Sequence, residues 1–377
     1  MKPKTKYEFV SLTPMMKVCP SAQYYILVGQ RSNGKTFCVL ERFIDNWWAS
    51  KETESNAIIR RWEEDFNKSK GDKFFENFIT NQYRGNIIAS KTNNKYNSIV
   101  WNLRAWWAVY VNEEGKEERR SPVPIAHSFA ITQEGHYKSS AYPRIKDILF
   151  DEMVSRTYLV DEFISFMNLL STIIRLRDDL KIFMCGNTLS GYCPYFAEMG
   201  LKNIRQMKQG DIDLYKMGKD GKMKIVVYMT DSITKHGKPS DVYFCFDNPA
   251  LQMVTGENVW ELAIYPHCPT KFKPMNIKFI YFILFDGETF QCEIIDKDKE
   301  WFTYIHRKTT PIKDEDKSII FKQEHDYRSN FRRRITKPYD KLGKFILSFY
   351  ASEKVFYQDN EVGDMISQYI AWSTQVR

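Results

Sequence analysis

An eight-residue loop near the N-terminus has the composition of a phosphate-binding loop. Its residues are Gly29, Gln30, Arg31, Ser32, Asn33, Gly34, Lys35 and Thr36, which fit the pattern GxxxxGK[ST]. The two glycines allow the backbone to wrap an anion and to point successive N–H groups at it. In such a loop the lysine reaches the β- and γ-phosphates of a nucleotide, and the threonine hydroxyl binds Mg²⁺. We therefore expect ATP and Mg²⁺ as cofactors.

Two adjacent carboxylates form the second candidate for chemistry. Asp151 and Glu152 directly follow the apolar run 148–150, which is typical of a buried strand. An aspartate at the carboxyl end of such a strand can hold Mg²⁺, usually through water. The glutamate after it can polarise the attacking water as a general base. We expect Asp151 to be a metal ligand and Glu152 to be catalytic.

A third candidate follows another apolar run, Ile182–Cys185. A polar side chain at the end of a neighbouring strand can contact the attacking water or the γ-phosphate. Asn187 is the first candidate for this role and Thr188 the second. The alternative is an ordinary turn, because Gly-Asn is a common turn signal.

These residues require particular elements to position them. Tyr24–Val28 is predicted to be a strand that ends at the loop, and apolar residues at helical spacing predict a helix over Lys35–Trp48. A second amphipathic helix is predicted over Val160–Arg175. Strands that alternate with helices indicate an α/β fold with parallel strands.

The length of 377 residues indicates two domains. We expect an ATPase domain over 1–201 and a linker or small connecting subdomain over 202–240, where periodicity is weak. Strand candidates such as Val242–Phe246 then dominate, and we expect an α+β domain over 241–377.

The composition excludes several other classes of protein. The formal net charge is +8, from 55 basic and 47 acidic residues, and it favours a polyanionic partner only weakly. Seven cysteines without a CxxC pair argue against a disulfide framework and against a zinc site. The sequence contains neither a leader-like N-terminus nor an apolar run that could span a bilayer, so we expect a cytoplasmic protein without a membrane partner.

The loop and the two strand ends together resemble the additional-strand, catalytic-glutamate branch of P-loop ATPases. More narrowly, the chain resembles the phi-29-like podovirus DNA encapsidation proteins, which are large-terminase-like packaging ATPases. Arg31 inside the loop, the segment 129–152 around Lys138, and the segment 174–187 carry the resemblance. It extends from about residue 20 to about residue 190.

This resemblance implies a function and a set of partners. Members of the family form a homopentameric ring at the portal vertex of a prohead, hydrolyse ATP and drive double-stranded DNA into the capsid. The implied partners are therefore double-stranded DNA, further copies of the chain and the portal protein, and a packaging RNA stays open. The implied location is the host cytoplasm and, transiently, the portal vertex, but not the mature virion.

The family also implies residues that act on a neighbouring subunit's nucleotide. Arg175 and Arg177 lie where its trans-acting arginine lies, with Arg177 the first choice, and Lys138 matches a second position at the subunit boundary. A cation supplied in trans would stabilise the charge that develops on the transferred phosphoryl group. The alternative is that both arginines are surface charges at a helix end.

Large terminases carry a second, RNase H-like nuclease domain that needs clustered carboxylates around two metal ions. Asp286, Asp359, Glu361 and Asp364 follow strand candidates and could form such a cluster. The resemblance implies instead a degenerate nuclease fold, and Asp286 lies in an Asp-Gly turn signal. We expect a vestigial domain without nuclease activity.

Sequence-independent DNA binding requires basic residues that contact phosphates. In the first domain the candidates are Arg60, Arg61, Lys68, Lys70 and Lys73, the lysines in a polar loop. In the second domain they are Arg328, Arg332, Arg333 and Arg334, which could equally contact the portal or a packaging RNA. The alternative is a solvated basic face.

Two other functions fit the motifs. One is another nucleic-acid-stimulated P-loop ATPase, such as a helicase or a DNA-transfer motor. The other is a non-hydrolysing, nucleotide-gated scaffold that binds nucleic acid. Glu152 argues against the scaffold, because a binding switch needs no water-polarising carboxylate.

Overall fold

The computed structural model describes residues 9–218, 220–231, 264–268 and 272–376, which form two compact units. Among these residues, unit 1 comprises 9–155, 161–188, 203–218 and 220–231. Unit 2 comprises 156–160, 189–202, 264–268 and 272–376. The strand expected over Val242–Phe246 lies outside the described residues.

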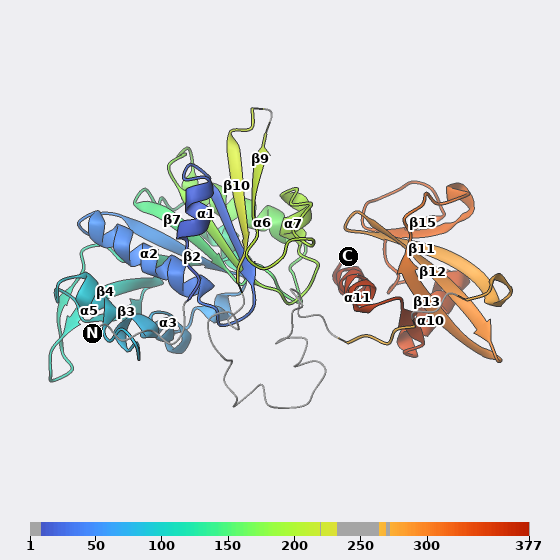
Figure 1. Ribbon diagram of the computed structural model, residues 1–377, viewed down its shortest axis with the longest axis horizontal. Coiled ribbons are helices and arrows are strands. Elements are labelled where there is room, and N and C mark those ends of the chain that lie inside the picture. Colours follow the sequence, from blue (N-terminus) through green and yellow to red (C-terminus); the bar gives the residue numbers. More distant parts are fainter. Residues whose placement is uncertain (1–8, 219, 232–263, 269–271, 377) are drawn as a thin grey trace. The chain divides into compact units, whose positions relative to one another are not determined.

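Unit 1 is built on a sheet that has ten strands within the described residues (Figure 1). The strands are β1 (Tyr24–Gly29), β2 (Ser55–Arg60), β3 (Ser98–Asn102), β4 (Ala105–Val111), β5 (Glu117–Arg120), β6 (Ala126–Ala130), β7 (Ile145–Asp151), β8 (Lys181–Asn187), β9 (Ile212–Met217) and β10 (Met223–Met229). Their order is β3-β4-β6-β2-β7-β8-β1-β10-β9, and β5 pairs with β4. The strands from β6 to β10 in this order are parallel, which confirms the α/β prediction.

Helices cover both faces of this sheet. They are α1 (Thr13–Val18), α2 (Lys35–Ala49), α3 (Lys68–Phe74), α4 (Glu76–Ile79), α5 (Ile87–Lys91) and α6 (Glu162–Ile174), with 3-10 helices η1 (Glu63–Asp65) and η2 (Ile131–Tyr137). In β7, Leu149 belongs to the core that α2 packs against, whereas the ring of the next residue, Phe150, stacks on Phe166 of α6. Successive strand residues point to opposite faces, so β7 is buried on both sides. This burial explains its unbroken apolar run.

The structure differs from the sequence-based division at 202–240. Within that segment β9 and β10 form an antiparallel pair, and β10 joins the main sheet beside β1. Residues Ile225–Val227 are buried against the phosphate-loop strand. β9 lies at the edge of the sheet, and its residues are half-buried or exposed, so it lacks the unbroken apolar run of a buried strand.

Unit 2 holds a second, mixed sheet in the order β15-β14-β11-β12-β13-β16. Its described elements are α7 (Pro194–Glu198), η4 (Pro274–Asn276), β11 (Ile277–Phe285), β12 (Glu288–Lys297), β13 (Glu300–Arg307), η5 (Glu315–Lys317), β14 (Ile319–Lys322), β15 (Phe331–Arg332), α10 (Lys341–Ala351), β16 (Val355–Tyr357) and α11 (Asn360–Gln375). Apolar residues of α10 and α11 share one core with β11, β12 and β13. No helix in the described part of the chain is long and apolar enough to cross a membrane.

Substitution of Trp106, on β4, tests the packing that stabilises the edge of the first sheet. Its ring is fully buried against Phe66, Phe74 and Phe75, and its Nε1 donates to the Gly71 carbonyl at 2.8 Å. We expect Trp106→Ala to lower the free energy of unfolding by about 3–5 kcal/mol, because it leaves a large cavity.

The neighbouring Trp107 is the matched control, since it points to the opposite face of β4 and is only half-buried. Trp107→Ala should cost less than about 1 kcal/mol. Urea unfolding followed by circular dichroism measures both variants. Equal losses would contradict the core assignment of Trp106.

Candidate active site

The phosphate loop joins the end of β1 to the start of α2. Ser32 and Gly34 have φ values of 60° and 91°, so left-handed residues alternate with right-handed or extended ones. This alternation makes backbone N–H groups converge on one side of the loop, as in anion-binding nests. Asn33 Nδ2 donates to Thr230 Oγ1 at 2.7 Å and attaches the loop to the residue after β10. The loop is therefore shaped and anchored by the sheet.

Lys35 lies inside this loop and is 5% exposed. Its ammonium group donates to the carbonyl oxygens of Gly29 at 3.0 Å and Gln30 at 2.6 Å, and to Asn33 Oδ1 at 3.1 Å. These contacts fix the position of a positive charge at the centre of the loop. An anion bound by the loop would lie next to this charge, which is the arrangement that the motif predicts.

The loop and the acidic strand meet directly. Thr36 Oγ1 donates to Asp151 Oδ1 at 2.7 Å, although 115 positions separate the two residues. Asp151 is the last residue of β7 and is 4% exposed. A hydroxyl and a carboxylate at this separation are oxygen donors of the class that Mg²⁺ prefers.

Arg60, at the end of β2, bridges the two carboxylates. Its Nη2 atom lies 2.6 Å from Asp151 Oδ2 and 3.4 Å from Glu152 Oε1, and its guanidinium lies over the ring of Phe74. Burial by itself would lower the pKa of Arg60, but the two carboxylates outweigh it and the pKa is raised. The guanidinium therefore stays charged. The sequence analysis expected Arg60 to contact DNA, whereas the structure places it in the cavity that the phosphate loop lines.

Glu152 follows with an unusual backbone conformation. Its φ of 61° lies in the left-handed region, and its side chain is 57% exposed. The next amide, of Met153, donates to the carbonyl oxygen of Cys185 on β8 at 2.8 Å. The chain thus turns sharply at Glu152, which separates its carboxylate from the buried Asp151. A solvent-accessible carboxylate beside a buried aspartate that could hold a metal ion suits a general base.

A cavity of about 780 Å³ connects these groups. Its lining residues are Phe9, Ser32, Asn33, Gly34, Lys35, Thr36, Phe37, Arg60, Phe74, Asn77, Thr80, Asn81, Gln82, Tyr83, Asp151, Glu152, Cys185, Gly186 and Asn187. Asn187 therefore lies in the site, whereas Thr188 is buried behind it. The wall from Phe74 to Tyr83 was missed by sequence reasoning, because its polar residues carry no motif. Only the packing of α3 and α4 brings it to the cavity.

The Arg177 side chain is hydrogen-bonded to the backbone of its own chain. Its guanidinium donates to five backbone carbonyl oxygens, around the start of β7 and at the end of α6: those of Tyr142, Pro143, Ile145, Ile173 and Ile174. A guanidinium has five N–H donors, so these bonds engage it from several sides. Arg177 thereby holds β7 and α6 together.

Arg175 and Lys138 are more accessible. Arg175 adopts a φ of 54° and donates from Nη2 to the Ser140 carbonyl at 2.7 Å. Lys138 is exposed, and its ammonium group lies 3.8 Å from Glu134. Leu176, between the two arginines, is fully exposed. These residues, like Arg31, are not among those that line the cavity within this chain.

Arg61 cannot serve as the predicted DNA contact. Its side chain is 4% exposed and forms a buried ion pair with Glu162. The lysines expected in a loop lie instead on α3, whose N-cap Asn67 accepts from the Lys70 amide. The side chains of Lys68, Lys70 and Lys73 are exposed, and Lys70 pairs with Asp65 at 3.1 Å. These lysines keep a surface position compatible with phosphate contacts.

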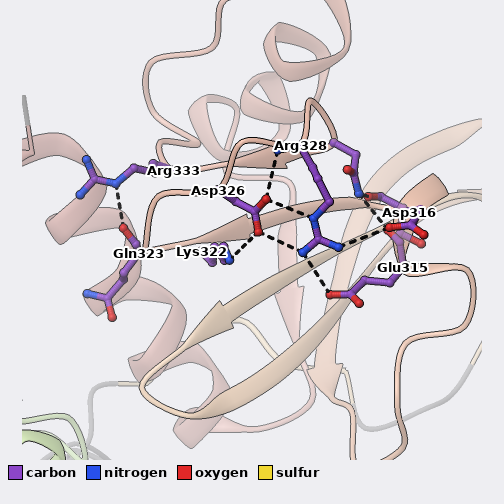
Figure 2. A network of polar contacts seen from close by, with 9 residues as sticks. Glu315, Asp316, Lys322, Gln323, Asp326, Arg328 and Arg333 are labelled. Atoms are coloured by element: carbon purple, nitrogen blue, oxygen red, sulfur yellow. Dashed lines mark hydrogen bonds and ion pairs between the residues drawn. The ribbon is translucent and has the colours of Figure 1, made fainter.

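Two of the four arginines in the basic cluster of unit 2 pair with neighbouring acids. Figure 2 shows the Arg328 guanidinium between Asp326, at 3.0 Å, and Asp316, at 3.3 Å. Arg332 pairs with Asp340 at 2.5 Å. Two further residues are Arg333, which donates to the Gln323 carbonyl and lies over the Trp372 ring, and Arg334, which is half-buried. The structure therefore does not present this cluster as an open cationic patch.

The carboxylates considered for a nuclease serve other partners. Asp359 caps α11, Asp364 accepts from Ser190 Oγ at 2.7 Å, and Glu361 lies 3.1 Å from Arg307. Asp286 lies in the turn between β11 and β12 with a φ of 52°. In the part of the chain that the structure describes, no group of three His, Cys, Asp or Glu residues is arranged to hold a metal ion.

Substitution of Gly29 tests whether nucleotide binding depends on the shape of the loop. A Cβ atom at this position would lie 1.9 Å from Thr230 Oγ1, a separation that real atoms do not reach. We expect Gly29→Ala to displace the loop and to weaken binding of Mg²⁺-ATP by about tenfold or more, since a shift of about 1 Å disrupts convergent hydrogen bonds. Gly135→Ala is the control, because nothing lies within 4 Å of its Cβ position. Titration with a fluorescent ATP analogue measures both; equal affinities would contradict the assignment.

Comparisons with known sequences identify phage packaging proteins as similar. The family described as "Podovirus DNA encapsidation protein (Gp16)" matches residues 125–209, which include Asp151, Glu152 and Asn187. A DNA packaging protein of Bacillus phage B103 is 34% identical over 68 residues, which is 17% of this chain and 21% of that protein. The match thus spans about a fifth of the length of that relative.

Solved structures of the same kind share the fold along most of the chain. "The Phi-28 gp11 DNA packaging Motor" matches with a TM-score of 0.53 and 17% identity, covering 98% of this chain and 99% of that one. "The bacteriophage Phi-29 viral genome packaging motor assembly" matches with a TM-score of 0.52 and 16% identity, covering 95% and 97%. At such identities the similarity concerns the fold. In sequence and in fold, the chain therefore resembles the phi-29-like podovirus DNA encapsidation proteins, as its phosphate loop and acidic strand predicted.

Proposed function

We propose that this chain is an ATP-driven motor subunit that moves double-stranded DNA into a preformed viral capsid. The observation that carries the proposal is the 2.7 Å hydrogen bond between Thr36 and Asp151. It joins the phosphate loop to the acidic strand, and Glu152 lines the same cavity. The resemblance to DNA encapsidation proteins then selects DNA packaging among the reactions that such a site could drive.

The geometry of the cavity supports a proposed role in hydrolysis for each residue. Lys35 and the loop amides would bind the β- and γ-phosphates, and Thr36 and Asp151 would hold Mg²⁺. A bound Mg²⁺ supplies positive charge against the phosphate oxygens. Glu152 would accept the proton of the attacking water, and Asn187, at the end of β8, would orient that water or the γ-phosphate. Arg60 contributes the cavity's second positive side chain and limits repulsion between the adjacent carboxylates.

A trans-acting arginine completes the proposed site. Arg175 is the better candidate than Arg177, because Arg177 is engaged by five carbonyl oxygens whereas Arg175 donates to Ser140 on the exposed surface. Lys138, which is also exposed, would act at the same boundary. Both residues belong to surfaces outside the cavity of their own chain, which suits action on a neighbour in a ring.

DNA contact is proposed for the exposed face of α3. This helix carries Lys68, Lys70 and Lys73 on its surface, while its last residue, Phe74, lines the nucleotide cavity beneath Arg60. Phosphate contacts of lysines are independent of sequence, as a translocating motor requires. One short helix would thus connect DNA with the catalytic carboxylates.

Assembly into a pentameric ring on the portal, with or without a packaging RNA, belongs to the same proposal. The similar solved structures are described as packaging motors, and the shared fold covers both units of this chain. We propose that unit 2 is a vestigial RNase H-like domain. Support comes from Asp359, Asp364 and Glu361, whose carboxylates cap a helix, hold a loop and pair with an arginine instead of converging.

Steady-state ATP hydrolysis with and without linear double-stranded DNA tests the motor function. We expect wild-type hydrolysis to rise with DNA, and Lys35→Ala to abolish it because phosphate binding is lost. Glu152→Gln should retain ATP binding but lower kcat by about 100-fold or more, since it removes the general base. Assays on prohead-assembled protein, with duplex unwinding measured in parallel, complete the test. Unwinding would favour a helicase, and full hydrolysis by Glu152→Gln would exclude the catalytic assignment.

Mixed rings test the trans-acting arginine. Arg175→Ala and Lys35→Ala subunits should each be inactive by themselves, because one lacks the trans cation and the other lacks phosphate binding. A mixture should recover hydrolysis, since some interfaces then combine an intact loop with an intact arginine. Arg177→Ala should instead lower the melting temperature, because it releases five carbonyl oxygens. Absence of recovery in mixtures, with rings shown to form, would contradict the assignment.

A further inference from the structure

A buried ion pair lies directly behind the proposed general base. We propose that Arg61 and Glu162 are positioning residues that hold the backbone of Glu152 in its left-handed conformation. This inference rests on the proposed function of Glu152, and it assigns to Arg61 a task unrelated to DNA. Neither residue of the pair lines the nucleotide cavity, so both would act through Glu152.

The ion pair is bidentate and buried. Arg61 Nε and Nη2 donate to the two carboxylate oxygens of Glu162 at 2.7 and 2.8 Å. The side chains are 4% and 0% exposed, respectively. Glu162 is the first residue of α6, where the positive end of the helix dipole favours a carboxylate. The orientation of the guanidinium is therefore fixed by the start of α6.

The same guanidinium reaches the backbone around the base. Arg61 Nη1 donates to the Glu152 carbonyl at 3.2 Å, and Nη2 donates to the Met153 carbonyl at 3.1 Å. On the other side, the Met153 amide donates to Cys185 on β8. The turn after Asp151 is thus held from β2 by Arg61 and from β8 by Cys185.

Such support is needed because Glu152 is strained. A non-glycine residue at a φ of 61° is disfavoured, by roughly 1–2 kcal/mol, relative to right-handed or extended backbone. In either of those conformations the Glu152 carboxylate would leave its place beside Arg60 and Asp151. Contacts that hold the carbonyl oxygens of both Glu152 and Met153 counter that relaxation.

The burial of two charges supports positioning over simple stabilisation. A buried ion pair seldom stabilises a fold more than apolar packing of similar volume would, because both charges lose their hydration. What a bidentate ion pair adds is a fixed geometry, since it holds the guanidinium in one orientation. Arg60 and Arg61, at the end of β2, have different partners. Arg60 contacts the carboxylates of the site, whereas Arg61 contacts the backbone that carries one of them.

A second ion pair in unit 1, between α2 and β7, provides a matched control. Asp147 is the third residue of β7, is 4% exposed in its side chain, and lies 2.8 Å from Arg42. It also accepts from Asn46 Nδ2 at 2.7 Å. Because Asp147 lies four residues before Asp151 on the same strand, its loss should affect the stability of β7 without reaching the turn at Glu152.

The test compares Glu162→Gln and Arg61→Lys with Asp147→Asn in the full chain assembled on proheads. We expect kcat for ATP to fall about 10- to 100-fold in both positioning variants while KM changes less than about twofold, because the base is misplaced but the loop is intact. Hydrogen exchange at the Met153 amide should become faster. Asp147→Asn should lower the melting temperature yet keep kcat within about twofold of wild type.

Two results would overturn the proposal. One is an equal fall in kcat for Glu162→Gln and Asp147→Asn at the same loss of melting temperature. The other is unchanged exchange at Met153 in both positioning variants. Failure of the proposed function is a separate outcome, because Glu152→Gln with full hydrolysis would remove the catalytic role of Glu152, while faster exchange at Met153 would still support the role of Arg61 in holding the turn.

Discussion

The hydrogen bond from Thr36 to Asp151 depends on one constraint, the parallel order of β7, β8 and β1. Parallel strands bring their carboxyl ends to the same edge of a sheet, so the ends of β1, β7 and β8 all lie at that edge. The phosphate loop extends from the first, Asp151 and Glu152 from the second, and Asn187 from the third. The strand between β7 and β1 sets the spacing at which a hydroxyl and a carboxylate meet at 2.7 Å.

Positive and negative side chains alternate around this edge of the sheet. The Lys35 ammonium lies within the loop, Asp151 and Glu152 face it from β7, and Arg60 joins the two carboxylates from β2. Glu162 and Arg61 continue the alternation behind the site, where both are buried. Each charge therefore has a partner of opposite sign or a set of backbone dipoles nearby. Such an arrangement holds the charged groups in fixed positions, as the proposed hydrolysis of a bound nucleotide would require.

Several of the described arginines have structural partners, which are carboxylates or backbone carbonyl oxygens. Arg177 connects the start of β7 with the end of α6, Arg61 holds the turn at Glu152, and Arg332 and Arg328 pair with acids in unit 2. Ion pairs leave the net charge unchanged, so the formal charge of +8 does not by itself locate a basic surface for a polyanion. The exposed lysines of α3 lie on the helix whose last residue, Phe74, lines the cavity.

The sequence by itself determined the elements whose chemistry is local. The phosphate loop, the acidic strand and the helix after the loop follow from glycine spacing, apolar runs and helical periodicity, and these signals lie within a few residues of one another. Only the tertiary structure decided the rest. Arg60 and Arg61 had the same local signal, a basic pair after a strand, yet one lines the cavity and the other is buried beneath it. Adjacent residues point in different directions, and their partners, Asp151 and Glu162, are about a hundred positions away. No local pattern records such distant pairings, because the fold alone brings the partners together.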